Sequence, residues 1–169
     1  MPVIALDTPP ANSLLQAYRD RRAYTDAYCL VLPRAVSLSE YIEAFYTTWL
    51  FKLERHILSI LVAKPSSDDQ AVALARGDRT RFAAWSVEAR ETDQIVMRDY
   101  LGKTCSWLMC EPQTDGATRL YFGSAIVPAR IRSYGRVDLG LPFHLMLGFH
   151  RSYSRALLRA AASRLMHRS

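Results

Sequence analysis

The chain has 169 residues, which is enough for one domain with a hydrophobic core but too few for two domains of ordinary size. Hydrophobic residues make up 50% of the chain and charged residues 22%, and this composition excludes disorder as the main state. The net charge of +6 is uneven, because residues 130–169 hold eight arginines against one acid, Asp138. Such a segment is most often a solvated helix face, and we expect no nucleic-acid partner.

Cysteine content and hydropathy bear on the compartment. Three cysteines without a CxxC spacing indicate a reducing environment, so we expect a cytoplasmic protein. The N-terminus lacks the basic region and the sustained apolar run of a signal peptide. The richest apolar stretch, residues 139–149, is much shorter than the roughly 20 residues needed to span a bilayer. An integral membrane protein is therefore not expected.

The N-terminal part divides into a lead segment and the start of the domain. Residues 1–20 are interrupted by prolines and are predicted to lie on the surface, although Leu14, Leu15 and Tyr18 could dock one short turn onto the body. Residues 21–169 are predicted to form a single domain. Its first strand is expected at residues 24–33, which are rich in aromatic and β-branched side chains and end at a proline.

Helices are expected next. Ser37 precedes Glu40 by three positions, which is the spacing of a capping box, and an apolar helical pattern follows over residues 41–63. A break near residues 47–48 would divide this segment into two helices. A short helix is predicted at residues 68–76, with capping residues before it and a glycine directly after it.

The middle of the chain alternates like a sheet. Four strand-like runs are separated by connections of hairpin length, which cannot make parallel crossovers, so an antiparallel meander is predicted. In the last run, Leu120, Phe122 and Ser124 share one face and Tyr121 lies on the other. The four predicted strands are residues 81–90, 94–99, 104–111 and 118–127.

The C-terminal segment is predicted to be a loop over residues 128–140 and then a helix that runs from Leu141 nearly to the end. With Arg151, Arg155 and Arg159 toward solvent, the opposite helix face is apolar and must be covered. An antiparallel sheet with one apolar face provides that cover, and the predicted fold is therefore α+β with two packed layers. The residues on the covered face are Met146, Phe149, His150, Tyr153, Leu157 and Ala160.

This order of elements, over residues 22–166, resembles the START-like or Bet v 1-like (SRPBCC) superfamily. The resemblance implies a helix-grip fold, in which a curved antiparallel sheet wraps around the long C-terminal helix, with a helix pair after the first strand. It also implies a pocket for a hydrophobic ligand, although the same fold hosts cyclases, transporters and regulators. Four stretches are similar to a bacterial group near DUF2867, namely residues 81–90, 106–109, 119–124 and 149–151.

His150 and Tyr153 are the candidate catalytic residues. They lie one turn apart on the inward face of the last helix, where a pocket of this fold would open. An imidazole can take or give a proton near neutral pH, and a phenol can hold a carbonyl oxygen. Together the two could assist an enolisation, cyclisation or dehydration. The competing interpretation is a hydrogen-bonded core pair that holds the helix on the sheet.

Aromatic and basic side chains are the candidate ligand-binding residues. The aromatic residues could line a cavity or fill the core, since small apolar ligand sites and cores share this composition. Arg98 and Arg119 could bind a ligand carboxylate or phosphate if they point inward, whereas pairing with strand acids would place them at the surface. The candidate ligand-binding set is Trp85, Trp107, Tyr121, Phe122, Met146, Phe149, Arg98 and Arg119.

No motif in the sequence indicates a metal or a cofactor. The four histidines form no HxH, HExxH or Cys/His cluster, and there is no GxGxxG, Walker loop or GxSxG. We therefore expect no metal and no cofactor. Cys105 and Cys110 are expected on opposite faces of one strand, where inert packing is the favoured role.

Three functions remain open. The first is binding of a small hydrophobic or aromatic molecule between the sheet and the C-terminal helix. The second is a cofactor-free cyclase or dehydratase that uses the same pocket, with His150 as acid or base and Tyr153 polarising the substrate. The third is an interaction protein whose arginine-rich last helix contacts an anionic membrane or a protein partner. The second function, unlike the first, requires that the His150 side chain face an open cavity.

Overall fold

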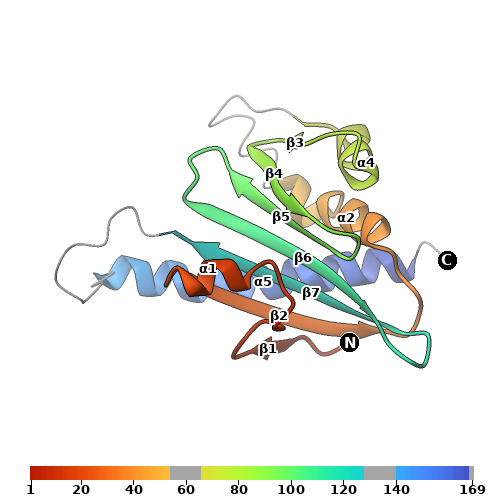
Figure 1. Cartoon of the computed structure of the whole chain (residues 1–169), viewed down its shortest axis with the longest axis horizontal. Coiled ribbons are helices and arrows are strands. Elements are labelled where there is room, and N and C mark those ends of the chain that lie inside the picture. The colour runs from red at the N-terminus through yellow and green to blue at the C-terminus, as the bar shows by residue number, and fades with distance from the viewer. Residues whose placement is uncertain (54–65, 128–139, 168–169) are drawn as a thin grey trace.

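The computed structural model describes residues 1–53, 66–127 and 140–167, and for residues 140–149 it describes the backbone alone. A sheet forms one layer, and helices α2 and α5 pack against one of its faces (Figure 1). The elements, in chain order, are β1 (Ile4–Leu6), α1 (Gln16–Asp20), β2 (Tyr24–Leu32), α2 (Leu38–Tyr46), α4 (Asp68–Arg76), β3 (Arg81–Phe82), β4 (Trp85–Arg90), β5 (Gln94–Asp99), β6 (Thr104–Pro112), β7 (Thr118–Ile126) and α5 (Gly140–Met166).

The sheet has seven strands in the order β1-β2-β7-β6-β5-β4-β3. Every neighbouring pair is antiparallel, so strands β3 to β7 form the predicted meander. Strand β2 pairs with β7 along its whole length, from Tyr24 opposite Ile126 to Leu32 opposite Thr118. The α+β helix-grip arrangement expected from the sequence is therefore confirmed.

Helices α2 and α4 begin and end where their capping residues predict. The Ser37 hydroxyl accepts from the Glu40 amide at 3.2 Å, and the Glu40 carboxylate accepts from the Ser37 amide at 2.9 Å. Helix α2 ends at Thr47, and helical backbone resumes over residues 49–53, which confirms the break. The remainder of the predicted helix, residues 54–63, lies outside the described residues. Helix α4 ends at Gly77, which takes a left-handed φ of 91°.

The prediction of one strand over residues 81–90 is wrong in one respect. The structure has two strands there, β3 and β4, joined by a tight turn. Ala83 takes a φ of 50°, and the chain reverses so that Phe82 pairs with Trp85. Alanine rarely adopts this conformation, and no glycine or asparagine marks the turn in the sequence. The reversal buries Phe82, which is 1% exposed, and this burial supplies a reason for the strained turn.

The lead segment packs on the outer face of the sheet, opposite α5 and α2. Leu15 and Tyr18 are buried there, as the predicted docking turn requires, and the preceding strand β1 was not predicted. The Gln94 side chain joins this segment to the sheet. Its oxygen accepts from the Leu14 amide at 2.8 Å and from Trp107 Nε1 at 2.9 Å. The outer face therefore has its own small core.

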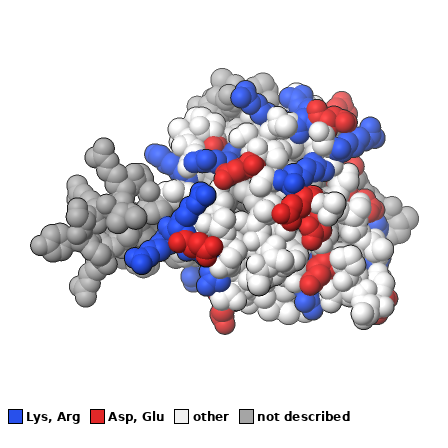
Figure 2. Space-filling model, in the orientation of Figure 1, with Lys and Arg blue, Asp and Glu red and all other residues white. Residues whose placement is uncertain are grey.

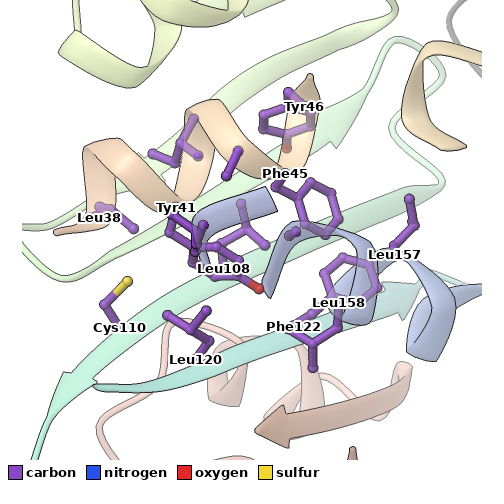
Figure 3. Close-up of a cluster of buried hydrophobic side chains, with 14 of the residues drawn as sticks. Leu38, Tyr41, Phe45, Tyr46, Leu108, Cys110, Leu120, Phe122, Leu157 and Leu158 are labelled. Carbon is purple, nitrogen blue, oxygen red and sulfur yellow. The ribbon is translucent and has the colours of Figure 1, made fainter. Parts of the chain in front are cut away.

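The main core lies between the inner face of the sheet and helices α2 and α5. Side chains from α2, including Tyr41 and Phe45, point toward strands β6 and β7, and Leu158 of α5 approaches the same cluster (Figure 3). Leu108 and Leu120, from β6 and β7, form the part of this cluster that lies on the sheet. The members labelled in Figure 3 are Leu38, Tyr41, Phe45, Tyr46, Leu108, Cys110, Leu120, Phe122, Leu157 and Leu158.

Candidate functional site

A cavity of about 280 Å³ lies at the seam between the inner face of the sheet and α5. Its walls are mostly apolar and aromatic, and they come from β4, β6, β7, α2 and α5. The described lining residues are Phe45, Phe51, Trp85, Thr104, Cys105, Ser106, Phe122, Ser124, Ala125, Ile126, His150, Tyr153, Ser154 and Leu157.

The sheet register explains why the seam is hollow at this position. Asp26, Ser124 and Ser106 are neighbours in one row across strands β2, β7 and β6. The next inward-facing row along the strands contains larger side chains, namely Tyr28, Phe122 and Leu108. Small polar residues replace large apolar ones, so less volume reaches α5 and a void remains.

His150 meets this polar row at the edge of the cavity. Its Nε2 lies 2.7 Å from the Ser124 Oγ and 3.5 Å from the Asp26 Oδ2. Ser124 also donates to Asp26, through its hydroxyl at 2.5 Å and its backbone amide at 3.2 Å. Since the serine hydroxyl donates its hydrogen bond to the carboxylate, its oxygen accepts from His150, and this network assigns the His150 ring proton to Nε2.

Asp26 is buried, with 8% of its side chain exposed, yet it is held as a carboxylate. Burial alone would raise its pKa, but hydrogen bonds from His150 and Ser124, together with the positive charge of His150 when its ring is doubly protonated, outweigh burial and lower it. Tyr28 also donates to Asp26, at 3.2 Å. Burial and the neighbouring Asp26 in turn raise the pKa of the Tyr28 hydroxyl, which keeps this phenol protonated.

Four of the predicted site residues meet at the cavity. Trp85, Phe122, His150 and Tyr153 all line it, although they come from β4, β7 and α5. The side chain of His150 is 34% exposed, so its ring is not enclosed by packed side chains. Met146 and Phe149 belong to α5, but the structure describes only their backbone.

The structure does not bring Trp107 and Tyr121 to the cavity. Both belong to the core on the outer face of the sheet, and each has a polar partner there. The Trp107 indole donates to Gln94, and the Tyr121 hydroxyl donates to Glu111 at 2.6 Å. Alternation along β6 and β7 separates them from the inward-facing residues, because adjacent positions point to opposite faces.

Arg98 and Arg119 also lie away from the cavity. Arg98 approaches Glu88 at 3.8 Å, and Arg119 approaches Glu111 at 3.4 Å, as expected for cross-strand surface pairs. Basic and acidic side chains are interspersed on the face of the molecule that Figure 2 shows. Neither arginine is placed to bind a carboxylate or phosphate inside the cavity.

The predicted arginine row on α5 is exposed. Arg151, Arg155 and Arg159 are all exposed to solvent. Arg151 donates to the Tyr24 hydroxyl at 3.3 Å, and the Arg155 guanidinium lies 5.4 Å from the centre of the Tyr28 ring. Contact between this row and an anionic surface stays a prediction.

The sequence interpretation missed Asp26 and Ser124 as site residues. A signal for each was present. Asp26 is the single charged residue of strand β2, and Ser124 shares the inward face with Leu120 and Phe122. The sequence does not show that β2 pairs with β7. This pairing places Asp26 opposite Ser124, although the two residues are 98 positions apart in the chain.

Two searches of the described part of the chain found nothing. Among the described side chains, those of residues 1–53, 66–127 and 150–167, no group of three or more His, Cys, Asp or Glu residues is arranged to hold a metal ion. No described helix combines the length and the apolar character required to cross a bilayer.

No protein-family model matches the chain, and no curated protein matches it. Among solved structures, the crystal structure of CalU16 from Micromonospora echinospora is similar, with 13% sequence identity and a TM-score of 0.33. The match covers 86% of this chain and 85% of CalU16. The assignment of the helix-grip arrangement rests on the strand order and the position of α5 described above.

Proposed function

We propose that this protein is a START-like domain that binds a small hydrophobic or aromatic molecule in the cavity between the sheet and α5. The observation that carries the proposal is the mostly apolar void of about 280 Å³ at that seam. Phe122 and Trp85 supply aromatic walls, and Leu157 supplies an aliphatic one. Apolar walls with a few convergent polar groups are the usual composition of a small-molecule site.

The size of the void sets the size of the ligand. An apolar cavity of roughly 150 Å³ holds benzene, so a void of about 280 Å³ suits a molecule with one or two fused six-membered rings. Tetralin, which has an aromatic ring fused to a saturated ring, is a suitable probe. It carries no polar atom, so its binding depends on the apolar surface it loses to water.

The test measures tetralin binding by isothermal titration calorimetry. Ser106→Phe introduces a large ring from a half-buried position in the cavity wall and is expected to weaken binding by tenfold or more. Ser86→Phe is the matched control, because Ser86 is also a half-buried strand serine but lies opposite Arg98, outside the cavity lining. Equal affinity in both variants, or absence of binding to the unmodified protein, would refute the proposal.

A second candidate function is favoured by the hydrogen-bond network of Asp26, Ser124 and His150. With its proton on Nε2, the His150 ring can accept a second proton at Nδ1, and the buried Asp26 carboxylate stabilises the cation that results. Tyr153 lines the same cavity and could polarise a carbonyl oxygen. This arrangement supports proton abstraction beside a carbonyl, the first step of an enolisation or a cofactor-free cyclisation.

Exchange of the protons next to the carbonyl of 1-tetralone tests this second candidate. In deuterated buffer the protein is expected to accelerate exchange, as followed by NMR, and His150→Gln is expected to remove the acceleration. Asp26→Asn should reduce it, because the imidazolium loses its charged partner. An exchange rate in the presence of the protein that equals the rate in buffer would exclude this function and leave ligand binding intact.

A further inference from the structure

Two hydrogen-bond donors at the cavity have no partner among the described residues. They are the indole Nε1 of Trp85 and the hydroxyl of Ser154, and neither atom is exposed to solvent. Both residues line the cavity, but they belong to β4 and α5. A buried donor without an acceptor is unfavourable, so each such group requires an explanation.

Outside the cavity lining, some buried donors also lack a described partner, namely the Ser13 hydroxyl and the Arg164 Nε, whereas a comparable indole and a comparable hydroxyl are paired. Trp107, which is also buried in the sheet, donates its indole N–H to Gln94 at 2.9 Å. Thr47, which directly follows α2, donates its hydroxyl to the carbonyl of Glu43, four residues earlier, at 2.6 Å. Ser154 is fully buried and could satisfy its hydroxyl in the same way, yet it does not. Among the described residues that line the cavity, Trp85 and Ser154 are the two with a buried donor that lacks a partner.

The charges of the described lining are already compensated. His150 approaches the carboxylate of Asp26, which is not itself a lining residue and also accepts from Ser124 and Tyr28. The arginines that could have bound an acid, Arg98 and Arg119, lie with their acidic partners on the outer face of the sheet. Among the described lining residues there is no lysine or arginine to pair with an anion.

We propose that the ligand is an uncharged molecule with an apolar body and an oxygen acceptor, such as a carbonyl, that accepts hydrogen bonds from Trp85 and Ser154. This inference rests on the proposed function, because it specifies the chemistry of the molecule that the cavity binds. A ligand of this class satisfies donors that the free protein leaves without acceptors. A pure hydrocarbon of the same size fills the void but leaves them unsatisfied.

The experiment compares three probes of nearly equal size: tetralin, 1-tetralone and 1,2,3,4-tetrahydro-2-naphthoate. Dissociation constants are measured by calorimetry for the unmodified protein and for the double variant Trp85→Phe/Ser154→Ala. We expect the ratio of the tetralin constant to the 1-tetralone constant to fall in the double variant, by roughly fivefold for each hydrogen bond lost. Tetralin binding should change little, since both substitutions preserve an apolar lining.

The unfolding midpoint of Ser154→Ala provides a second readout. Because the Ser154 hydroxyl has no acceptor in the free protein, its removal should leave the urea midpoint unchanged or raise it. Ser152→Ala, at an exposed position on the same helix, is the matched control. A lower midpoint for Ser154→Ala than for this control would show that the hydroxyl has a partner within the protein, and would overturn the inference.

The possible outcomes separate the two proposals. If tetralin and 1-tetralone both bind and the double variant leaves their ratio unchanged, the acceptor inference fails and the binding function stands. Tighter binding of the carboxylate than of the ketone overturns the requirement for an uncharged ligand. If none of the three probes binds the unmodified protein, both proposals fail together.

Discussion

The two ends of the seam between the sheet and α5 differ in how completely they are filled. At one end, Leu120 of β7 and Leu158 of α5 are fully buried in a packed cluster that also includes α2. At the other end, small polar residues occupy the sheet row that includes Ser124, and a cavity remains. The same two layers therefore provide stability at one end and a binding volume at the other, and the size of the inward-facing side chains decides which.

Truncation of neighbouring leucines on α5 tests this comparison with the largest expected effect. Leu158→Ala opens a void in the filled end and should reduce the free energy of unfolding by about 2–5 kcal/mol. Leu157 already borders the cavity, so Leu157→Ala enlarges an existing void and should cost less. Urea unfolding of the two variants measures the difference. An equal loss in both would contradict the distinction between a filled and a hollow end.

The outer face of the sheet behind the cavity is tightly packed, which limits the hollow region to the inner face. A Cβ atom added at Gly123 would lie 2.8 Å from the Asp26 carbonyl oxygen and 2.8 Å from the Leu15 side chain. We expect Gly123→Ala to destabilise the protein by about 1–3 kcal/mol through overpacking. Thermal unfolding measures this loss of stability. An unchanged melting temperature would mean that the lead segment does not pack against strand β7 at Gly123.

The carboxylate beside the cavity should make stability depend on pH. Because the folded state lowers the pKa of Asp26 below its ordinary value of 3.8, its contribution is present above that value and is lost as the pH falls through the lower folded value. Near pH 7, Asp26→Asn should be less stable than the unmodified protein by about 1–3 kcal/mol.

Denaturant titrations from pH 7 to pH 3 compare the two proteins. The difference in unfolding free energy between the unmodified protein and Asp26→Asn should shrink as the pH drops below about 4. In that range the Asp26 carboxyl group takes up a proton more readily in the unfolded chain than in the folded protein. A difference that stays constant over this range would contradict the assignment of Asp26 as a buried carboxylate held by Ser124 and His150.

The smallest effect is expected for the cysteines. Burial raises the pKa of Cys29 and raises that of Cys105 to about 12, so the reactive thiolate is scarce at neutral pH in both. Cys110 is buried in the filled end of the seam and behaves in the same way. Native protein should therefore react slowly with a thiol reagent that labels all three cysteines after unfolding. Rapid labelling of the folded protein would show that one face of the sheet opens readily.

Local sequence patterns were sufficient for most of the architecture. The capping box at Ser37, the Gly77 stop and the period-two alternation of the meander each depend on neighbouring residues, and each was confirmed. The reversal at Ala83 was not predicted, because the burial of Phe82 rather than a turn residue accounts for it. Features set by nearby residues can be read from a single chain.

The candidate site was only partly predictable. A position on α5 that faces the sheet could be inferred for His150 from helical periodicity alone. Its partners Asp26 and Ser124 depend on how β2 registers with β7, which hairpin spacing does not reveal. The candidate set included aromatic residues from both faces of the strands, because alternation defines two faces without saying which one α5 covers, and Trp107 and Tyr121 belong to the other face.

The most direct measurement of the central claim is an isotope-filtered NMR spectrum of the protein with bound tetralin. The account predicts nuclear Overhauser effects from tetralin to the methyl groups of Ile126 and Leu157, which border the cavity. It predicts none to Leu120 or Leu158, which are buried in the filled end. Contacts to the second pair, or to neither pair when tetralin is bound, would contradict a binding cavity at this seam.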